Sequence, residues 1–260
     1  MEIRMDDRTA LITGGSLGLG AAMAESFCSA GARVAILARR SQPLEDTRAA
    51  IAEKTGGDIR GYVCDVSLAE QLTNTYAQVE ADLCPVDILV NNAGHAQVGP
   101  FEEITDEQWQ ADLDLKLFAA IRLARLAFPG MKQRNWGRII NLLNTLAKAP
   151  SPGSAPTSVT RAAGMALTKV MAGEGAPHNV LVNALLIGRI ESDQIRRAYD
   201  QKSRDIDYHE FLANAGKGLP MGRYGTAQEC ANLACFLASD AASYVTGCAI
   251  NMDGGLSEVV

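Results

Sequence analysis

The sequence predicts an α/β protein with a doubly wound parallel sheet and helices on both faces, for three reasons. Short apolar runs alternate with helical patterns along the chain, without a linker or low-complexity break. A glycine-rich turn follows the first apolar run and opens into a helix. The 260 residues, 47% of them hydrophobic, suffice for one large domain spanning 1–260. In such a sheet, ligands bind beyond the carboxyl ends of the strands.

The spacing of the apolar residues predicts the individual elements. We expect strands at 10–12, 33–38, 59–65, 86–90, 137–143, 180–186 and 248–252. We expect helices at 21–27, 44–54, 68–82, 106–134, 157–173 and 227–239. Thr105 or Asp106 is the expected cap of the long helix. Residues 188–220 lack a clear period and carry charge, so we expect an inserted lid there.

Composition and charge exclude several classes of protein. A net charge of -6 argues against a nucleic-acid partner, because phosphate binding requires a basic surface. No run reaches the ~18 apolar residues of a membrane helix, and residues 1–8 are too polar for a signal peptide. We therefore expect a cytoplasmic protein without a membrane partner. The six cysteines form no CxxC pair, which favours reduced core thiols over a metal site or disulfides.

The glycine-rich turn, Thr13–Gly20 (TGGSLGLG), predicts dinucleotide binding. Glycine allows a positive φ and lets a diphosphate approach the main chain. The helix that follows presents unpaired N–H groups and a positive dipole end. Tight turns also use glycine for purely structural reasons, but here a strand precedes the turn and a second strand follows about twenty residues on.

The end of the second strand indicates which dinucleotide binds. NAD-binding proteins commonly place a carboxylate there for the ribose 2′-OH, whereas NADP requires positive charge for its 2′-phosphate. This chain has Ala38, followed by Arg39 and Arg40. We therefore predict NADP(H), with Arg39 as the main phosphate contact, and keep NAD as the alternative.

Further motifs, in order and spacing, extend over nearly the whole chain. They are TGxxxGxG at 13–20, Asp65 after the third strand, NNAG at 91–94, GRIIN at 137–141, YVTG at 244–247 and DGG at 253–255. Together they resemble the short-chain dehydrogenase/reductase family. The resemblance implies a single Rossmann domain with a seven-stranded parallel sheet, an NAD(P) cofactor, and a homodimer or homotetramer built on two long central helices.

The same resemblance implies a set of cofactor-binding residues. Asp65 and Val66 correspond to adenine contacts, and Ser192 stands where a threonine commonly holds the nicotinamide carboxamide. The full set is Gly14, Ser16, Leu17, Gly18, Leu19, Gly20, Arg39, Arg40, Asp65, Val66, Asn92, Ala93, Gly94, Arg161, Gly188, Ile190 and Ser192.

The catalytic positions depart from the family pattern. The family uses a serine, a tyrosine, a lysine four residues after the tyrosine, and an asparagine. By position these roles fall on Asn144, Thr157, Arg161 and Lys116 in this chain, so none of the four residue types is kept. A shift in register does not restore them, because no tyrosine of the chain has a lysine four residues on.

The four replacements have different chemical capacities. Arg161 can hold ribose hydroxyls but stays charged. Thr157 can donate a hydrogen bond, but it is a far weaker acid than a phenol with a pKa of ~10. Asn144 can donate N–H bonds to a developing oxyanion. Lys116 can deliver a proton if Arg161 lowers its pKa by repulsion, and His95 is either a second proton donor or a turn residue.

Three functions therefore remain open. The first is an NADP(H)-dependent oxidoreductase that reduces an imine, an activated alkene or a carbonyl, with Lys116 or water as the acid. The second is a catalytically silent dinucleotide sensor or partner subunit. The third and weakest is a lyase or dehalogenase, because such relatives lose the glycine-rich turn and keep the tyrosine. Lys116 beside Arg161 indicates an anionic small-molecule substrate, unless Asp112 or Asp114 compensates the two cations; no metal is expected.

Overall fold

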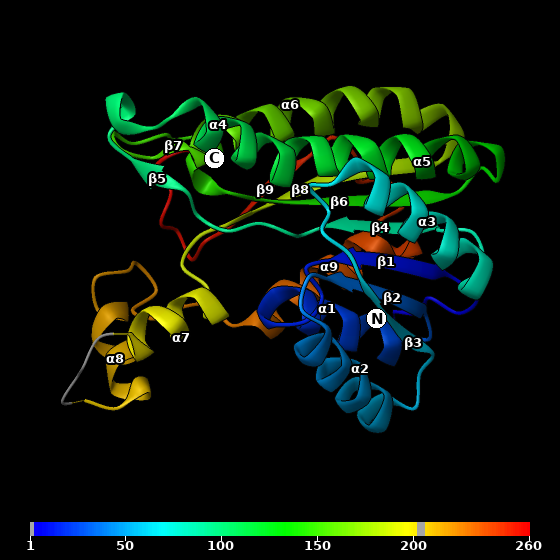
Figure 1. The fold of residues 1–260 in the computed structure, drawn as a ribbon, viewed down its shortest axis with the longest axis horizontal. Helices are drawn as coiled ribbons and strands as arrows, with labels where there is room; N and C mark the ends of the chain where they lie inside the picture. The colour runs from blue at the N-terminus through cyan, green and yellow to red at the C-terminus, as the bar shows by residue number, and fades with distance from the viewer. Residues whose placement is uncertain (1–2, 202–205) are drawn as a thin grey trace.

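The chain forms one seven-stranded sheet, in a computed structural model that describes residues 3–201 and 206–260 (Figure 1). The strand order is β3-β2-β1-β4-β6-β8-β9, and every neighbouring pair is parallel. The strands are β1 (Thr9–Thr13), β2 (Arg33–Ala38), β3 (Ile59–Val63), β4 (Ile88–Asn91), β6 (Gly137–Asn144), β8 (Val180–Ile187) and β9 (Ala249–Met252). The predicted fold class is confirmed.

Helices cover both faces of this sheet (Figure 1). The helices are α1 (Gly18–Ser29), α2 (Ser41–Thr55), α3 (Ala69–Leu83), α4 (Asp106–Leu113), α5 (Ala119–Gln133), α6 (Thr157–Gly175), α7 (Asp193–Asp200), α8 (Tyr208–Gly216) and α9 (Ala227–Ala238). Short 3-10 turns lie at Phe101–Glu103, Thr145–Ala147, Ala176–His178 and Asp240–Ala242. Among the described residues, no helix combines the length and apolar character needed to cross a membrane.

The apolar runs of the strands are continuous because both faces of the sheet are buried. Ile12 and Ile36 point into a core formed with α1, α2 and α9. Their neighbours Leu11 and Leu37 point into the opposite core, formed with α3 and α5. Side chains alternate between the two faces of a strand, so a strand with helices on both sides needs apolar residues at every position.

Three features differ from the sequence-based expectation. The helix predicted at 106–134 starts at the capping box of Thr105, but a π-helical turn at Asp114–Phe118 separates α4 from α5. The predicted lid contains two helices, α7 and α8, joined by contact between the rings of Tyr199 and Tyr208; its residues 202–205 lie outside the described part. The short antiparallel strands β5 (Val98–Gly99) and β7 (Ala155–Pro156) were not predicted, because a strand of two residues is too short to show an alternation of apolar and polar side chains.

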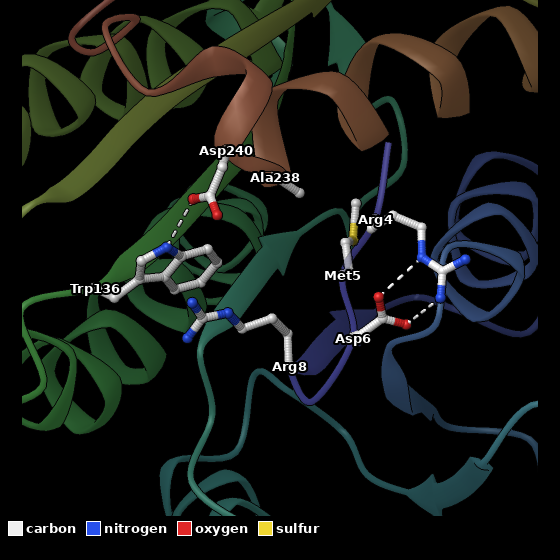
Figure 2. Close-up of a pocket in the computed structure, with 7 residues that line it drawn as sticks. All are labelled: Arg4, Met5, Asp6, Arg8, Trp136, Ala238 and Asp240. Carbon is white, nitrogen blue, oxygen red and sulfur yellow. Dashed lines mark hydrogen bonds and ion pairs between the residues drawn. The ribbon is translucent and has the colours of Figure 1, made fainter. Parts of the chain in front are cut away.

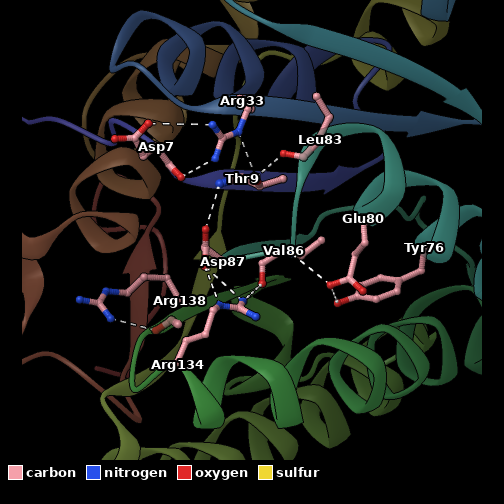
Figure 3. Close-up of polar contacts among 11 residues, drawn as sticks. Asp7, Thr9, Arg33, Tyr76, Glu80, Leu83, Val86, Asp87, Arg134 and Arg138 are labelled. Atoms are coloured by element: carbon pink, nitrogen blue, oxygen red, sulfur yellow. Dashed lines mark hydrogen bonds and ion pairs between the residues drawn. The ribbon is translucent and has the colours of Figure 1, made fainter.

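A polar network ties the strands together at the amino edge of the sheet (Figure 3). Asp87, directly before β4, accepts hydrogen bonds from Thr9 N at 3.2 Å and from Arg134 Nε at 3.2 Å. Arg134 also donates to Val86 O at 2.7 Å. The network therefore fixes β1 and the end of α5 against the start of β4.

Replacing Asp87 tests how much this network stabilises the fold. We expect Asp87→Ala to lower the free energy of unfolding by about 2 kcal/mol, because it leaves the Thr9 N–H and the Arg134 guanidinium without their acceptor. Urea denaturation measures the change. The control is Asp58→Ala, which removes an exposed partner of Arg60 and should change stability by less than about 1 kcal/mol. Equal effects of the two substitutions would contradict a special role for Asp87.

Candidate active site

The turns after β1 and β4 form one hydrogen-bonded unit at the carboxyl edge of the sheet. Asn92 Nδ2 donates to Thr13 O at 2.9 Å and to Gly14 O at 3.1 Å. In return, Thr13 Oγ1 accepts hydrogen bonds from Asn92 N and Ala93 N, both at 3.0 Å. Since β1 and β4 are the neighbours at which the strand order reverses, this is where open α/β sheets bind their ligands.

The glycine-rich turn has the geometry that a diphosphate requires. Gly14 and Gly18 have φ angles of +67° and +54°, a region that favours glycine. A Cβ atom on Gly20 would lie 2.2 Å from Gly14 O, so the start of α1 has no room for a side chain there. Leu17 stands at the N-cap of α1 and provides no side-chain cap. The first N–H groups of α1 are thus left for an anion.

The remaining residues predicted to bind cofactor fall into three groups. Arg39 and Arg40 are exposed after β2, and Arg39 Nη1 lies 4.0 Å from Asp65 Oδ2. Val66 and Ile190 are buried in the two cores, so only their backbone can reach a ligand. The others follow β1, β4 or β8 at the same edge and are Ser16, Leu19, Gly94, Gly188 and Ser192.

A buried ion pair lies beside this edge. Lys116, on the π-helical turn, donates from Nζ to Asp112 Oδ1 and to Thr157 Oγ1, the latter at 2.8 Å. The Lys116 and Asp112 side chains are each only 1% exposed. Asp114, the other carboxylate that the sequence left open, instead pairs with Arg122 at 3.1 Å. Asp112 is therefore the residue that compensates Lys116.

The Thr157 hydroxyl is fully engaged by its neighbours. It donates to Gln97 O at 2.8 Å, and it accepts from Gln97 N at 2.9 Å and from Lys116. A hydroxyl has one hydrogen and two lone pairs, so these three bonds use its whole capacity. The one hydrogen of the hydroxyl, which the sequence identified as a possible donor, is directed to Gln97 O.

Arg161 and Asn144 complete the cluster. Arg161 Nη1 donates to Leu142 O, and a Cβ atom on Gly94 would lie 2.7 Å from Arg161 Nη2. The guanidinium therefore packs directly against the turn after β4. Asn144 ends β6, two residues beyond Leu142.

Unsatisfied polar atoms concentrate in this cluster. Asp112 Oδ2, Asn144 Oδ1 and Arg161 Nε are buried and have no hydrogen-bond partner. They are three of the six such side-chain atoms in the described part of the chain. Buried polar groups are normally paired, so a group of exceptions marks a place that a ligand or water completes.

Burial and neighbouring charges shift the pKa values of the cluster. Burial, and to a smaller extent the Arg161 charge, lower the pKa of Lys116 to about 8, against the opposing hydrogen bond and charge of Asp112. Burial also lowers the pKa of Arg161 to about 10. The pKa of His95 is lowered by burial and by Lys116, so His95 is mainly neutral at pH 7. Two cations thus face one carboxylate at neutral pH, and burial rather than repulsion is the main cause of the shift at Lys116.

A separate cavity of about 200 Å³ lies at the amino edge of the sheet, and Figure 2 shows the residues that line it. It is lined by Arg4, Met5, Asp6, Arg8, Trp136, Ala238 and Asp240. Charged groups that line it are paired within the protein: Arg4 forms an ion pair with Asp6 at 2.8 Å, and Asp240 accepts a hydrogen bond from Trp136 Nε1 at 2.9 Å. Within the described ranges, no group of three or more His, Cys, Asp or Glu side chains could hold a metal ion.

Comparison with known proteins identifies the family of the chain. Residues 14–257 match the family described as enoyl-(acyl carrier protein) reductase. The acetoacetyl-CoA reductase of Rhizobium meliloti (strain 1021) is 35% identical over 248 residues, which are 95% of this chain and 98% of that protein. The chain belongs to the short-chain dehydrogenase/reductase family. Members of this family are NAD(P)-dependent oxidoreductases, and this chain is one of them.

Two solved members of the family resemble the structure closely. L-sorbose reductase from Gluconobacter frateurii, complexed with NADPH and L-sorbose, is 32% identical, with a TM-score of 0.94 over 100% of both chains. A short chain oxidoreductase from Pseudomonas aeruginosa PAO1, described as containing an atypical catalytic center, is 37% identical. It has a TM-score of 0.92, covers 99% of this chain and 100% of its own, and is also known with NADPH bound.

The sequence left one contact of the cluster open and missed another. Asp112 and Asp114 were both candidates to compensate Lys116; Asp112 lies four residues before Lys116, a spacing that places side chains together on a helix, and it is the partner in the structure. Gln97 acts through its backbone N–H and C=O. Its side-chain type therefore carries no signal.

The tight turn at Gly20 gives a direct test of this geometry. We expect Gly20→Ala to lower the free energy of unfolding by about 2 kcal/mol or more, because the new Cβ collides with a backbone oxygen. The control is Gly173→Ala in α6, where a Cβ has nothing within 4 Å; alanine there should stabilise by about 0.5–1 kcal/mol. Thermal or urea unfolding shows whether each substitution lowers or raises the free energy of unfolding. Stabilisation by Gly20→Ala would refute the packing described.

Proposed function

We propose that this protein is an NADPH-dependent reductase of a carbonyl group or a carbonyl-activated double bond, in which buried cations replace the phenolic acid. The observation that carries the proposal is the buried cluster at the carboxyl edge. There Lys116 and Arg161 face a single carboxylate, Asp112. Such an excess of positive charge, shielded from water, stabilises negative charge that develops during a reaction.

The cofactor-binding part of the proposal rests on residues that fit NADPH. The open start of α1 and the glycine-rich turn would hold the diphosphate, and Arg39 and Arg40 would hold the 2′-phosphate. Arg161 would hold ribose hydroxyls beside Gly94. The two structural relatives with NADPH bound support the same assignment. When bound, NADPH supplies the hydride.

The charge of the cluster distinguishes among the possible acceptors. In our proposal Asn144 and Arg161 hold the substrate oxygen, and their N–H groups stabilise its developing negative charge. An iminium is already cationic and would be repelled by Lys116 and Arg161. We therefore favour a carbonyl or conjugated alkene over an imine, and a substrate that carries an anionic group.

The proton in this proposal comes from Lys116. Its Nζ lies 2.8 Å from Thr157 Oγ1. Threonine alone is too weak an acid, but its hydroxyl can give up one proton while it takes another from Lys116. For this step the hydroxyl turns from Gln97 O toward the substrate oxygen. Lys116 is then the acid and Thr157 the relay.

One observation favours a second candidate function. Thr157 is only 2% exposed, and all of its hydrogen-bonding capacity is used within the protein. If the Thr157 hydroxyl keeps these bonds, it passes no proton to a substrate. The protein would then bind a dinucleotide without turnover, as a sensor or a silent partner subunit.

Cofactor titration followed by a turnover assay separates these candidates. NADPH and NADH are titrated by calorimetry, and NADPH consumption is then measured with ketones, conjugated alkenes and imines, each with and without a carboxylate. We expect tighter binding of NADPH than of NADH, and turnover of anionic ketones or alkenes. Tight NADPH binding without consumption would favour the silent function, and absence of binding would refute both.

Arg39 tests the choice of cofactor. We expect Arg39→Ala to weaken NADPH binding by about tenfold, or ~1.4 kcal/mol, and to leave NADH binding unchanged, because only NADPH carries the 2′-phosphate. Arg48→Ala is the control, since Arg48 pairs with Glu45 on α2. An equal loss for both cofactors would contradict a phosphate contact at Arg39.

The pH dependence of reduction tests Lys116. Reduction requires the protonated ammonium, whose pKa is about 8, so the rate should be level below pH 7 and fall as the pH rises through 8. In the direction of oxidation the unprotonated amine is required, so the rate should instead rise as the pH increases through 8. We call this pH-dependent part of the profile the alkaline limb. Lys116→Met should lower kcat at pH 7 by about 100-fold or more and remove this limb. An unchanged profile in the variant would eliminate Lys116 as the acid.

A further inference from the structure

Asp112 is a buried carboxylate that the family pattern does not explain. It lies on α4, its side chain is 1% exposed, and it holds Lys116 across one helical turn. Its second oxygen, Oδ2, has no hydrogen-bond partner among the described residues. Asp114, two residues further on, instead forms a part-exposed pair with Arg122.

Stability alone gives no reason for this pair. Two buried charges lose their hydration, and an unsatisfied carboxylate oxygen adds to the cost. Apolar side chains of similar volume commonly replace such pairs without loss of stability. The pair therefore calls for a role in the chemistry of the site.

The surroundings of Lys116 define that role. Arg161, on α6, repels the ammonium, and His95, after β4, is mainly neutral at pH 7. The Thr157 hydroxyl accepts one N–H but carries no charge. In the described part of the chain, Asp112 is the one carboxylate within ion-pair distance of Lys116 Nζ. Without it, burial and Arg161 would both drive Lys116 toward the neutral amine.

We propose that Asp112 is a positioning residue of the reaction, which keeps Lys116 protonated at neutral pH and directs its N–H at Thr157. The inference rests on the proposed function, because it acts through Lys116 as the acid. Asp112 lies on α4, whose start is held by the capping box of Thr105 and Gln108. The carboxylate thus fixes one end of a hydrogen-bonded chain from α4 through Lys116 to α6 and Gln97.

A nuclear magnetic resonance titration of lysine side chains tests the proposal without turnover. The protein is labelled at lysine ¹³Cε, and the Lys116 signal is identified by its loss in Lys116→Met. We expect Asp112→Asn to lower the pKa of Lys116 from about 8 to about 7 or below. The alkaline limb of the rate profile should move to lower pH by the same amount. At pH 8, kcat should fall at least about fivefold, while KM and NADPH affinity stay within about twofold.

Asp114→Asn is the matched control, because it removes a carboxylate two residues away that does not touch Lys116. It should change neither the Lys116 signal nor the rate profile. An Asp112→Asn protein with the wild-type pKa at Lys116 would overturn the proposal. If the wild-type protein turns over no substrate, the proposed function fails, but the pKa comparison still decides whether Asp112 controls Lys116.

A double variant separates positioning from a structural role. In Asp112→Leu with Lys116→Met, both charges are replaced by apolar groups, so the fold should persist with a similar Tm. We expect its turnover to be as low as that of Lys116→Met alone. Turnover near the wild-type level in the double variant would show that the pair is only structural, and would overturn the proposal.

Discussion

The candidate site depends on one interaction, the buried ion pair of Lys116 and Asp112. Burial of an ammonium is costly unless a carboxylate and further hydrogen bonds compensate it, and here Asp112 and Thr157 both do so. The π-helical turn places Lys116 at this point, and Thr157 connects it to the backbone of Gln97. The pair therefore links three separate segments of the chain.

The parallel sheet brings this pair to the dinucleotide end of the molecule. Asn92 joins the turns after β1 and β4 by bonding to Thr13 and Gly14, and Arg161 packs against Gly94 directly after them. The open start of α1 and the cation cluster therefore belong to the same edge. Family members of different chemistry share this edge, so the side chains that follow the strands, not the fold, determine the reaction.

Sequence patterns were sufficient for the sheet and its main helices, since strands buried on both faces and amphipathic helices leave clear periods. They failed for α7 and α8, where charged outward side chains such as Arg196 and Arg197 obscure the short apolar face. The site was predicted as residue types at positions, including Lys116 and Arg161. The sequence left Asp112 and Asp114 as alternatives, although the four-residue spacing favours Asp112. The structure decides for Asp112, since Asp114 pairs with Arg122 instead.

The proposed function requires that hydride transfer occurs without a tyrosine acid. The most direct measurement follows deuterium from NADPH labelled at the nicotinamide C4 into products of ketone and conjugated-alkene substrates, detected by mass spectrometry. We expect one deuteron on the reduced carbon of the product, with label transferred from one face of the nicotinamide. Retention of all label on bound NADPH, with every substrate class recovered unchanged, would contradict it.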